Sequence, residues 1–477
     1  LFWLINILWS VFGVSQKTAM VVPFLAGFSV LVLTARLSTR LFPTEKDAPL
    51  LSVALLAGSL PFVLYTNLIM FDLLLSVAVL VGVTALWDFF KTEQNRHIFV
   101  FAAAVGAGLL IKGPAVLLHM APALLLVRYW MGAAAPPVKS SAPKILAGLV
   151  LGIVIALCWA IPAAMEGGKE FTEKIFYGQT AGRMVNAFDH KHPAYWYLMF
   201  VPLFVVPWVF SPALWSGLKS FLSDSAAQEN KRFLLSWLAV VFVAFSFISG
   251  KQVHYLLPLM PPLALLLCAG VLKARETFRK QDVFPILIGV NMLVFLPVVL
   301  YSFAGHLAAF PPHSVHMEEA FQSLHIWPAI AIGVAVFGLG FMVVRTKKTR
   351  AIVLMSVAMM LVMGSLQLAA STGVYLNYNL ESFGADIEGH QDQPLAFAGK
   401  YHGEFGFLAR LQKPLEVIAF DEMAAWFKAH PTGHIILYTK TPADFKAYTT
   451  VLSQPYRLTT YFLLLAPKGR QGANADN

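Results

Sequence analysis

Residues 70–90 read MFDLLLSVAVLVGVTALWDFF, an apolar run with one carboxylate near each end. A helix needs about 20 apolar residues to cross the hydrocarbon core of a bilayer, so this run predicts a membrane span. Similar runs recur along the chain. The candidate spans lie near residues 18–35, 50–66, 70–90, 98–111, 114–130, 145–164, 195–217, 233–249, 255–272, 283–303, 327–344 and 351–370. We therefore expect an α-helical polytopic membrane protein with about 12 spans.

The composition agrees with this class. The 477 residues are 58% hydrophobic and 13% charged, whereas a soluble domain is nearer half apolar and a quarter charged. A single soluble globule is thereby excluded. Cys158 and Cys268 both lie inside apolar runs, so the sequence predicts no disulfide framework.

The basic residues are distributed unevenly between the loops. Of the 35 Lys and Arg residues, 19 fall on one side of the predicted membrane, 7 on the other, and 9 follow residue 371. The positive-inside bias makes the 19-residue side cytoplasmic. This distribution accounts for the formal charge of +10 without a nucleic-acid partner. For Arg96 and Arg128 to share the cytoplasmic side, residues 98–130 must form a hairpin of two short helices that meet at Lys112-Gly-Pro114.

The composition changes from about Gly373, where charged residues return and apolar runs shorten. Short runs at 394–398, 415–419, 434–438 and 461–465 predict strands, and 402–411, 421–429 and 442–449 predict helices. We expect a transmembrane domain over residues 1–372 and a small periplasmic α/β domain over 373–477. Its polar end, from Gly469, is expected to be disordered.

Two ionisable residues border predicted spans on the outer side, where each is a candidate for function. Asp72 opens the quoted run; a helix N-terminus favours a carboxylate there, and a catalytic or metal-binding role is the alternative. Lys112 lies at the tip of the hairpin, where it either binds an anion or snorkels to the interface.

Two outer loops supply further candidates. Arg183 lies in the polar segment 163–194, and a guanidinium fork suits a phosphate. The segment Ser249-Gly-Lys-Gln-Val-His-Tyr-Leu-Leu-Pro258 places Lys251, His254 and Tyr255 at one membrane boundary. Three donors there suit a lipid phosphate at headgroup depth, and a plain interfacial loop is the alternative. A bound divalent cation is left open by these residues.

No nucleotide-binding glycine loop, HExxH or Gly-x-Ser-x-Gly pattern is present in the sequence. The predicted cytoplasmic loops are also too short for a nucleotide domain. Energy for a reaction must therefore arrive with an activated, membrane-borne substrate.

Three motifs carry a family resemblance. Asn67-Leu-Ile-Met-Phe-Asp72, Ile111-Lys-Gly-Pro114 and Ser249-x-Lys-x-x-x-Tyr-Leu-Leu-Pro258, the last followed by Pro261-Pro262, resemble in order and spacing the GT-C membrane glycosyltransferases. Within these, the chain is similar to protein O-mannosyltransferases and to bacterial lipid A aminoarabinose transferases. The resemblance covers residues 1–270 and implies thirteen spans with a C-terminal periplasmic α/β domain.

The resemblance implies an enzyme of the bacterial inner membrane with its active site facing the periplasm. It implies an inverting transfer of a sugar from a polyprenyl (undecaprenyl) phosphate carrier to lipid A or to a periplasmic protein. Asp72 matches the second acidic position of the family, and Lys251 and Tyr255 match a stretch near the carrier phosphate. Arg183 corresponds loosely to an arginine for the same phosphate, and Lys112 and His254 are possible substrate contacts.

The family's first acidic motif is not in this sequence, which begins at Leu1. Leu1-Phe-Trp-Leu4 resembles the stretch just after that motif. We therefore expect that the first span and the first periplasmic loop precede residue 1. A flippase or transporter of lipid-linked sugars is the alternative from another class, and it predicts internal repeats and charges near the midplane.

Overall fold

The computed structural model describes residues 1–173, 191–226, 228–274, 348–371, 378–457 and 460–468, with a few isolated positions between 282 and 338. The chain divides into two compact units. The described part of the first unit is helical up to residue 274 and again over 348–363, and the second contains a five-stranded sheet.

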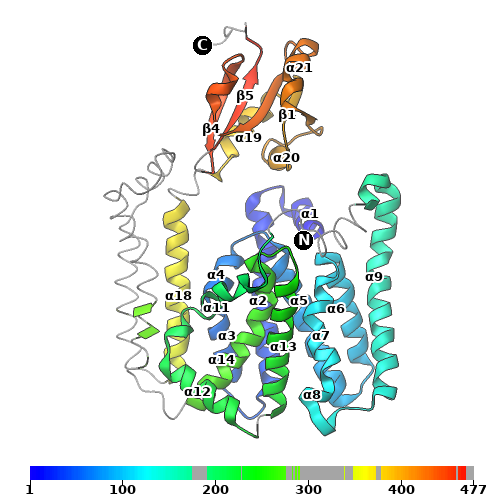
Figure 1. Cartoon of the computed structure of the whole chain (residues 1–477), viewed down its shortest axis with the longest axis vertical. Coiled ribbons are helices and arrows are strands. Elements are labelled where there is room, and N and C mark those ends of the chain that lie inside the picture. The colour runs from blue at the N-terminus through cyan, green and yellow to red at the C-terminus, as the bar shows by residue number, and fades with distance from the viewer. Residues whose placement is uncertain are drawn as a thin grey trace. The chain divides into compact units, whose positions relative to one another are not determined.

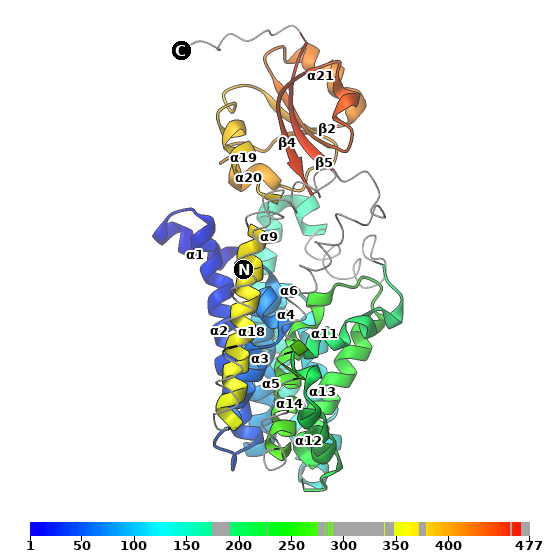
Figure 2. The ribbon, with the colours of Figure 1, turned by 90° about the vertical axis from the view of Figure 1, so that its left-hand side faces the viewer.

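Six helical segments of the described residues are long and apolar enough to cross a membrane. They are α2 (Gln16–Leu41), α5 (Phe71–Thr92), α7 with α8 (Ala115–Ala134), most of α9 (Val138–Lys169), α13 (Gln228–Phe247) and η5 with α14 (Val253–Ala274). Figures 1 and 2 show these helices alongside one another in one bundle. The mostly helical polytopic architecture predicted from the apolar runs is confirmed. Its span count stays a prediction, because 283–303 and 327–344 lie almost wholly outside the described residues.

Other helices complete this unit. They are α1 (Phe2–Phe12), α3 (Ala48–Ala57), α4 (Leu60–Thr66), α6 (Arg96–Lys112), η3 (Ala194–Phe200), α11 (Val201–Val205), η4 (Trp208–Phe210), α12 (Pro212–Ser223) and most of α18 (Lys348–Ser371). The span 115–134 consists of α7 (Ala115–Leu125), α8 (Val127–Met131) and η1 (Gly132–Ala134). The predicted span at 50–66 is the pair α3 and α4, which bends by 69°. Counted as one span, this pair raises the described total to seven.

The predicted span at 195–217 was wrong as a single helix. The structure has four short helices there, from η3 to α12. Pro202, Pro207 and Pro212 explain the breaks, because proline lacks the N–H that a continuous helix needs and clashes with the preceding turn.

The hairpin predicted from the charge bias is present. Helix α6 ends at Lys112 and α7 begins at Ala115. Gly113 between them has φ +61° and ψ −148°, a conformation that side chains with a Cβ rarely adopt. The turn therefore holds Lys112 at the very end of α6.

Small residues bring neighbouring helices into close contact. A Cβ on Gly152 of α9 would lie 2.7 Å from the Val105 side chain of α6. A Cβ on Gly217 of α12 would lie 2.1 Å from the carbonyl oxygen of Gly270 on α14. Such contacts are typical of membrane helices, which pack without a hydrophobic driving force between them.

The second unit contains the predicted α/β domain. Its strands are β1 (Leu395–Ala398), β2 (Glu416–Ile418), β3 (His434–Thr439), β4 (Thr449–Tyr456) and β5 (Thr460–Ala466), in the order β2-β1-β3-β5-β4. Strands β1, β2 and β3 are parallel, and β5 is antiparallel to β3 and β4. Helix α19 (Glu381–Glu388) precedes β1, whereas helices α20 (Glu404–Leu408) and α21 (Met423–Ala429) and the 3-10 helices η8 (Phe420–Glu422) and η9 (Pro442–Phe445) lie between strands.

Both faces of this sheet are buried. Ile436 packs with Phe383 of α19 and Phe405 of α20 on one face, whereas Ile435 packs with Trp426 of α21 on the other. The domain therefore has helices on both sides of the sheet. The four predicted strands are all present, while β4 and α19 were missed and the helix predicted at 442–449 is only the short turn η9. The expected disordered end from Gly469 lies outside the described residues.

Candidate active site

The predicted outer-side carboxylate and lysine form an ion pair. Asp72 lies in the first turn of α5, and Lys112 ends α6. The Lys112 ammonium donates a hydrogen bond to Oδ1 of Asp72. The two residues are 40 positions apart in sequence, and the Gly113 turn places Lys112 where it meets the beginning of α5.

The 3-10 helix η5 (Val253–Leu259) adds two more of the predicted residues to this pair. His254 Nε2 lies 3.9 Å from Oδ2 of Asp72. The Lys112 ammonium lies over the Tyr255 ring, 4.3 Å from its centroid, within the range of a cation–π contact. Asp72, Lys112, His254 and Tyr255, which we call the Asp72 cluster, thus come from three elements.

Burial differs sharply across the Asp72 cluster. The Asp72 side chain is 2% exposed, whereas those of Lys112 and His254 are 23% and 16% exposed. The carboxylate therefore lies behind the two nitrogen-bearing side chains, which face outward. A buried carboxylate can hold the partly exposed Lys112 ammonium in place for an anionic ligand, because charged hydrogen bonds are strong and directional.

Lys251 has a different environment from the one the sequence led us to expect. It is 2% exposed, and its ammonium donates to the carbonyl oxygens of His192 at 2.8 Å and Ile248 at 2.5 Å. Burial lowers the pKa of this ammonium from its usual value. Among the described residues, the Lys251 ammonium thus donates its hydrogen bonds to backbone carbonyl groups. Its predicted contact with a phosphate stays a prediction.

The remaining predictions cannot be placed. Arg183 lies outside the described residues. Within the described ranges, no group of three His, Cys, Asp or Glu side chains could hold a metal ion.

One neighbour of the Asp72 cluster was missed from the sequence. The ring of Tyr65, in α4, lies 5.9 Å from that of His254. Its position seven residues before Asp72, next to the Asn67–Asp72 motif, was the available signal.

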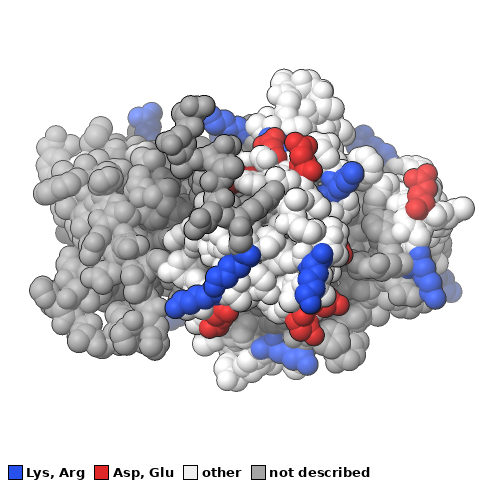
Figure 3. Space-filling view, turned by 90° about the horizontal axis from the view of Figure 1, so that it is seen from above, with Lys and Arg blue, Asp and Glu red and all other residues white. Residues whose placement is uncertain are grey.

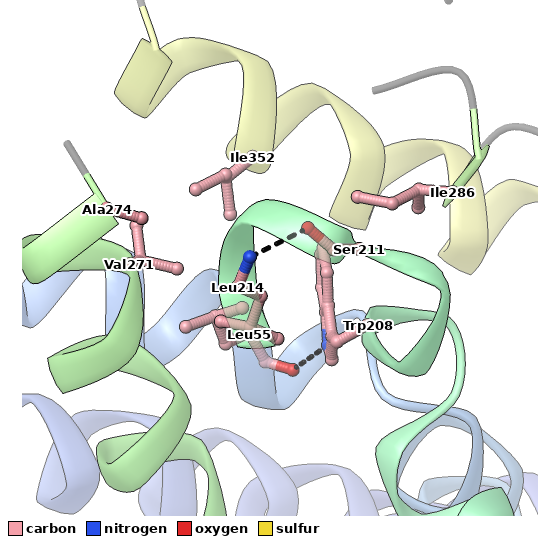
Figure 4. Close-up of a pocket in the computed structure, with 8 residues that line it drawn as sticks. All are labelled: Leu55, Trp208, Ser211, Leu214, Val271, Ala274, Ile286 and Ile352. Atoms are coloured by element: carbon pink, nitrogen blue, oxygen red, sulfur yellow. Dashed lines mark hydrogen bonds between the residues drawn. The ribbon is translucent and has the colours of Figure 1, made fainter. Parts of the chain in front are cut away.

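A pocket elsewhere in the helical unit has a different character. Figure 4 shows it where α3, η4, α12, α14 and α18 approach one another. Its lining residues are Leu55, Trp208, Ser211, Leu214, Val271, Ala274, Ile286 and Ile352. The Trp208 indole donates to the Leu55 carbonyl at 2.8 Å, and Ser211 accepts from the Leu214 amide at 3.2 Å. The described residues of its wall include no ionisable side chain, so they supply no group for acid–base or phosphate chemistry.

One face of the molecule carries charged side chains of both signs (Figure 3). Figure 3 shows Lys and Arg interspersed with Asp and Glu among the described residues of the face that it displays. This mixture has none of the single-sign character of a nucleic-acid surface.

Comparisons with known proteins agree with the resemblance. Residues 1–160 match the model of the dolichyl-phosphate-mannose-protein mannosyltransferase family. The undecaprenyl phosphate-alpha-4-amino-4-deoxy-L-arabinose arabinosyl transferase of Yersinia pestis (strain Pestoides F) is 27% identical over 172 residues, and that of Yersinia enterocolitica is 28% identical over 173. Each match covers 34% of this chain and 30% of the relative's length.

The fold match extends over nearly the whole chain. The crystal structure of ArnT from Cupriavidus metallidurans bound to undecaprenyl phosphate superimposes with a TM-score of 0.72. The match covers 97% of this chain and 86% of that protein, at 16% sequence identity. The apo state of the same protein matches with the same TM-score at 15% identity. Residues 1–160 are thus similar in sequence to the protein mannosyltransferase family, and almost the whole chain shares the fold of ArnT.

Proposed function

We propose that this protein transfers a sugar from a polyprenyl phosphate carrier, of the undecaprenyl type, to an acceptor at the periplasmic face of the inner membrane. Lipid A is the acceptor that the sequence resemblance to the aminoarabinose transferases favours, and the similarity to the Yersinia arabinosyl transferases supports a carrier of this type. The Asp72 cluster is the observation that carries the proposal, because it joins the three motifs of the family resemblance in one place.

The carrier phosphate is the group that the Asp72 cluster would bind. The Lys112 ammonium and the His254 imidazole are partly exposed nitrogen donors, and Tyr255 lies beside Lys112 with a phenol. In the transfer, an acceptor oxygen attacks the anomeric carbon while the bond from that carbon to the phosphate oxygen breaks. Both bonding electrons leave with the phosphate, whose growing charge these donors stabilise.

Asp72 has a positioning role in this proposal. Its carboxylate is 2% exposed and engaged with Lys112, so it is poorly placed to take a proton from an acceptor. It instead holds the ammonium at the point where the phosphate binds. An acceptor phosphate is ionised at neutral pH and needs orientation rather than a general base, which fits lipid A better than a protein hydroxyl.

The orientation of the site follows from the charge bias. By the positive-inside bias, the 19 basic residues of the opposite loops support a cytoplasmic location for those loops. Asp72, Lys112 and Tyr255 then face the periplasm, where the sheet domain is also expected. Arg183, from the same predicted side, is a further candidate phosphate ligand.

Protein O-mannosylation is the second candidate function. The family model that matches residues 1–160 carries the name of protein mannosyltransferases. The two functions share the carrier phosphate and differ in the acceptor, so an acceptor assay separates them.

The test uses the full chain in proteoliposomes with an undecaprenyl-phosphate-linked sugar and either lipid A or a Ser/Thr-rich periplasmic peptide. Transfer to lipid A, reduced about 100-fold by Lys112→Met, is the expected result. Lys17→Met, at an exposed lysine near the start of α2, is the matched control and should keep full activity. Transfer to the peptide alone would replace lipid A as acceptor. Movement of the carrier without any transferred product would overturn the proposal in favour of a flippase.

A further inference from the structure

Two loops of the helical unit are joined by backbone hydrogen bonds next to the Asp72 cluster. Lys191 and Gly250 form an isolated antiparallel bridge. The His192 amide donates to the carbonyl oxygen of Ser249 at 3.3 Å. Segment 191–192 therefore lies beside segment 249–250, although nearly 60 residues separate them in sequence.

Lys251 connects the same two segments through its side chain. The ammonium donates to His192 in one segment at 2.8 Å and to Ile248, just before the other, at 2.5 Å. Burying an ammonium is unfavourable unless its protons find acceptors. Here two carbonyl oxygens accept them, in a side chain only 2% exposed.

The joined loops lead directly into η5. The Tyr197 hydroxyl donates to the Gln252 carbonyl at 3.1 Å, and the Tyr255 amide donates to the same carbonyl at 3.1 Å. Tyr197 itself is fully buried. Gln252 thus fixes the first turn of η5, which carries His254 and Tyr255.

We propose that Lys251 is a positioning residue, which clamps segment 191–192 to segment 248–252 and thereby places His254 and Tyr255 around Asp72 and Lys112. The clamp itself is independent of the proposed function, and only its expected effect on sugar transfer rests on that function. It replaces a direct contact between Lys251 and the carrier phosphate with an indirect effect through η5.

The first test removes the ammonium while keeping the length of the side chain. Lys251→Met loses both hydrogen bonds to backbone, and we expect sugar transfer from the undecaprenyl-linked donor to fall about 10- to 100-fold, as for a misplaced catalytic group. Lys251→Arg keeps donors for the His192 and Ile248 carbonyls and should recover part of the rate.

A cross-link distinguishes the clamp from direct contact. Lys191→Cys with Gly250→Cys places two thiols across the antiparallel bridge, where opposed Cα atoms lie within disulfide range. The exposed Cys158 is replaced by Ser to prevent mispairing. Oxidation in the Lys251→Met background should restore at least about half of the transfer rate, and reduction should abolish the recovery. A complete disulfide that restores nothing would overturn the positioning role, because a missing phosphate ligand cannot be replaced in this way.

Hydrogen exchange tests the clamp without any substrate. We expect the His192 and Tyr255 amides to exchange at least about 10-fold faster in Lys251→Met than in the wild type, and at the wild-type rate once the cross-link forms. Unchanged exchange in Lys251→Met would overturn the clamp whatever the activity. The two measurements can also diverge, with faster exchange in Lys251→Met and no binding of undecaprenyl phosphate by the wild-type protein. That pair of results would uphold the clamp and reject the proposed function.

Discussion

The pairing of Asp72 with Lys112 is the residue-level contact on which the site depends. Asp72 is 2% exposed and lies at the start of α5, and Lys112 is partly exposed at the end of α6. Removing one member leaves the other charge without its closest described counter-ion, which is costly in a buried place. Asp72→Asn and Lys112→Met should each lower the free energy of unfolding by about 2 kcal/mol.

A double-mutant cycle measures this pair directly. The Asp72→Asn/Lys112→Met variant should be destabilised by clearly less than the sum of the single variants, because it leaves neither charge alone. Thermal unfolding in detergent supplies the free energies. Strictly additive effects would mean that the ion pair contributes nothing.

His119 offers a second prediction at this scale. It is fully buried in α7, its ring lies 4.9 Å from that of Phe245, and neither ring nitrogen has a partner among the described residues. Buried polar atoms without partners are destabilising. His119→Phe should therefore match or exceed the wild-type melting temperature, with His119→Asn, which keeps polar atoms there, as the comparison. A clear loss of stability in His119→Phe alone would show that the ring nitrogens hold a buried water.

The residues of the Asp72 cluster could be singled out from the sequence, whereas their contacts with one another could not. Asp72, Lys112, His254 and Tyr255 each stood out as polar groups beside apolar runs. The ion pair and the ring contact depend on how α5, α6 and η5 pack, which no local pattern encodes. Lys251 illustrates the limit, because its motif indicated a phosphate ligand while its ammonium is engaged by backbone carbonyls.

At the scale of elements, glycines determine which helices can approach. Gly217→Ala should destabilise the protein by about 1–3 kcal/mol, because the added methyl meets the Gly270 carbonyl of α14. Gly364→Ala, in α18, meets nothing within 4 Å and should stabilise by up to about 1 kcal/mol through helix propensity. Thermal unfolding of both variants checks the opposite signs. Equal changes in stability in the two variants would contradict the close packing of α12 on α14.

The loop after α12 should confer an acid-dependent loss of stability. The hydrogen bond from Lys273 holds the pKa of Asp224 below its ordinary value of 3.8. Because the pKa of Asp224 is lower in the folded than in the unfolded protein, the stabilisation is fully present above pH 3.8. It is lost as the pH falls through the pKa of the folded protein. The melting temperatures of wild type and Asp224→Asn should therefore converge below pH 3.8. A constant difference from pH 6 to pH 3 would contradict this linkage.

Secondary structure was predictable where the pattern was strong. The long apolar helices and the four apolar strands followed from periodicity. Strand β4 did not, because Thr449–Tyr456 combines Ser453, Gln454 and Pro455 with few apolar residues at an edge of the sheet. The region 195–217 is apolar enough for a span, but its prolines divide it into short helices.

At the scale of the whole molecule, the two units of the chain bury their apolar residues in different ways. The helical unit has many exposed apolar side chains, as expected for lipid contact, whereas the sheet domain buries both faces of its sheet. Apolar run length predicted the first and short alternating runs predicted the second. The place where they divide, predicted after residue 372, stays a prediction.

The central claim is that the Asp72 cluster binds the phosphate of a polyprenyl carrier. The most direct measurement is the affinity of the detergent-solubilised full chain for undecaprenyl phosphate, compared among wild type, Lys112→Met and Lys17→Met. Loss of one charged hydrogen bond predicts a Kd raised about 10- to 100-fold in Lys112→Met and unchanged in Lys17→Met. Equal affinity in all three proteins would contradict the account.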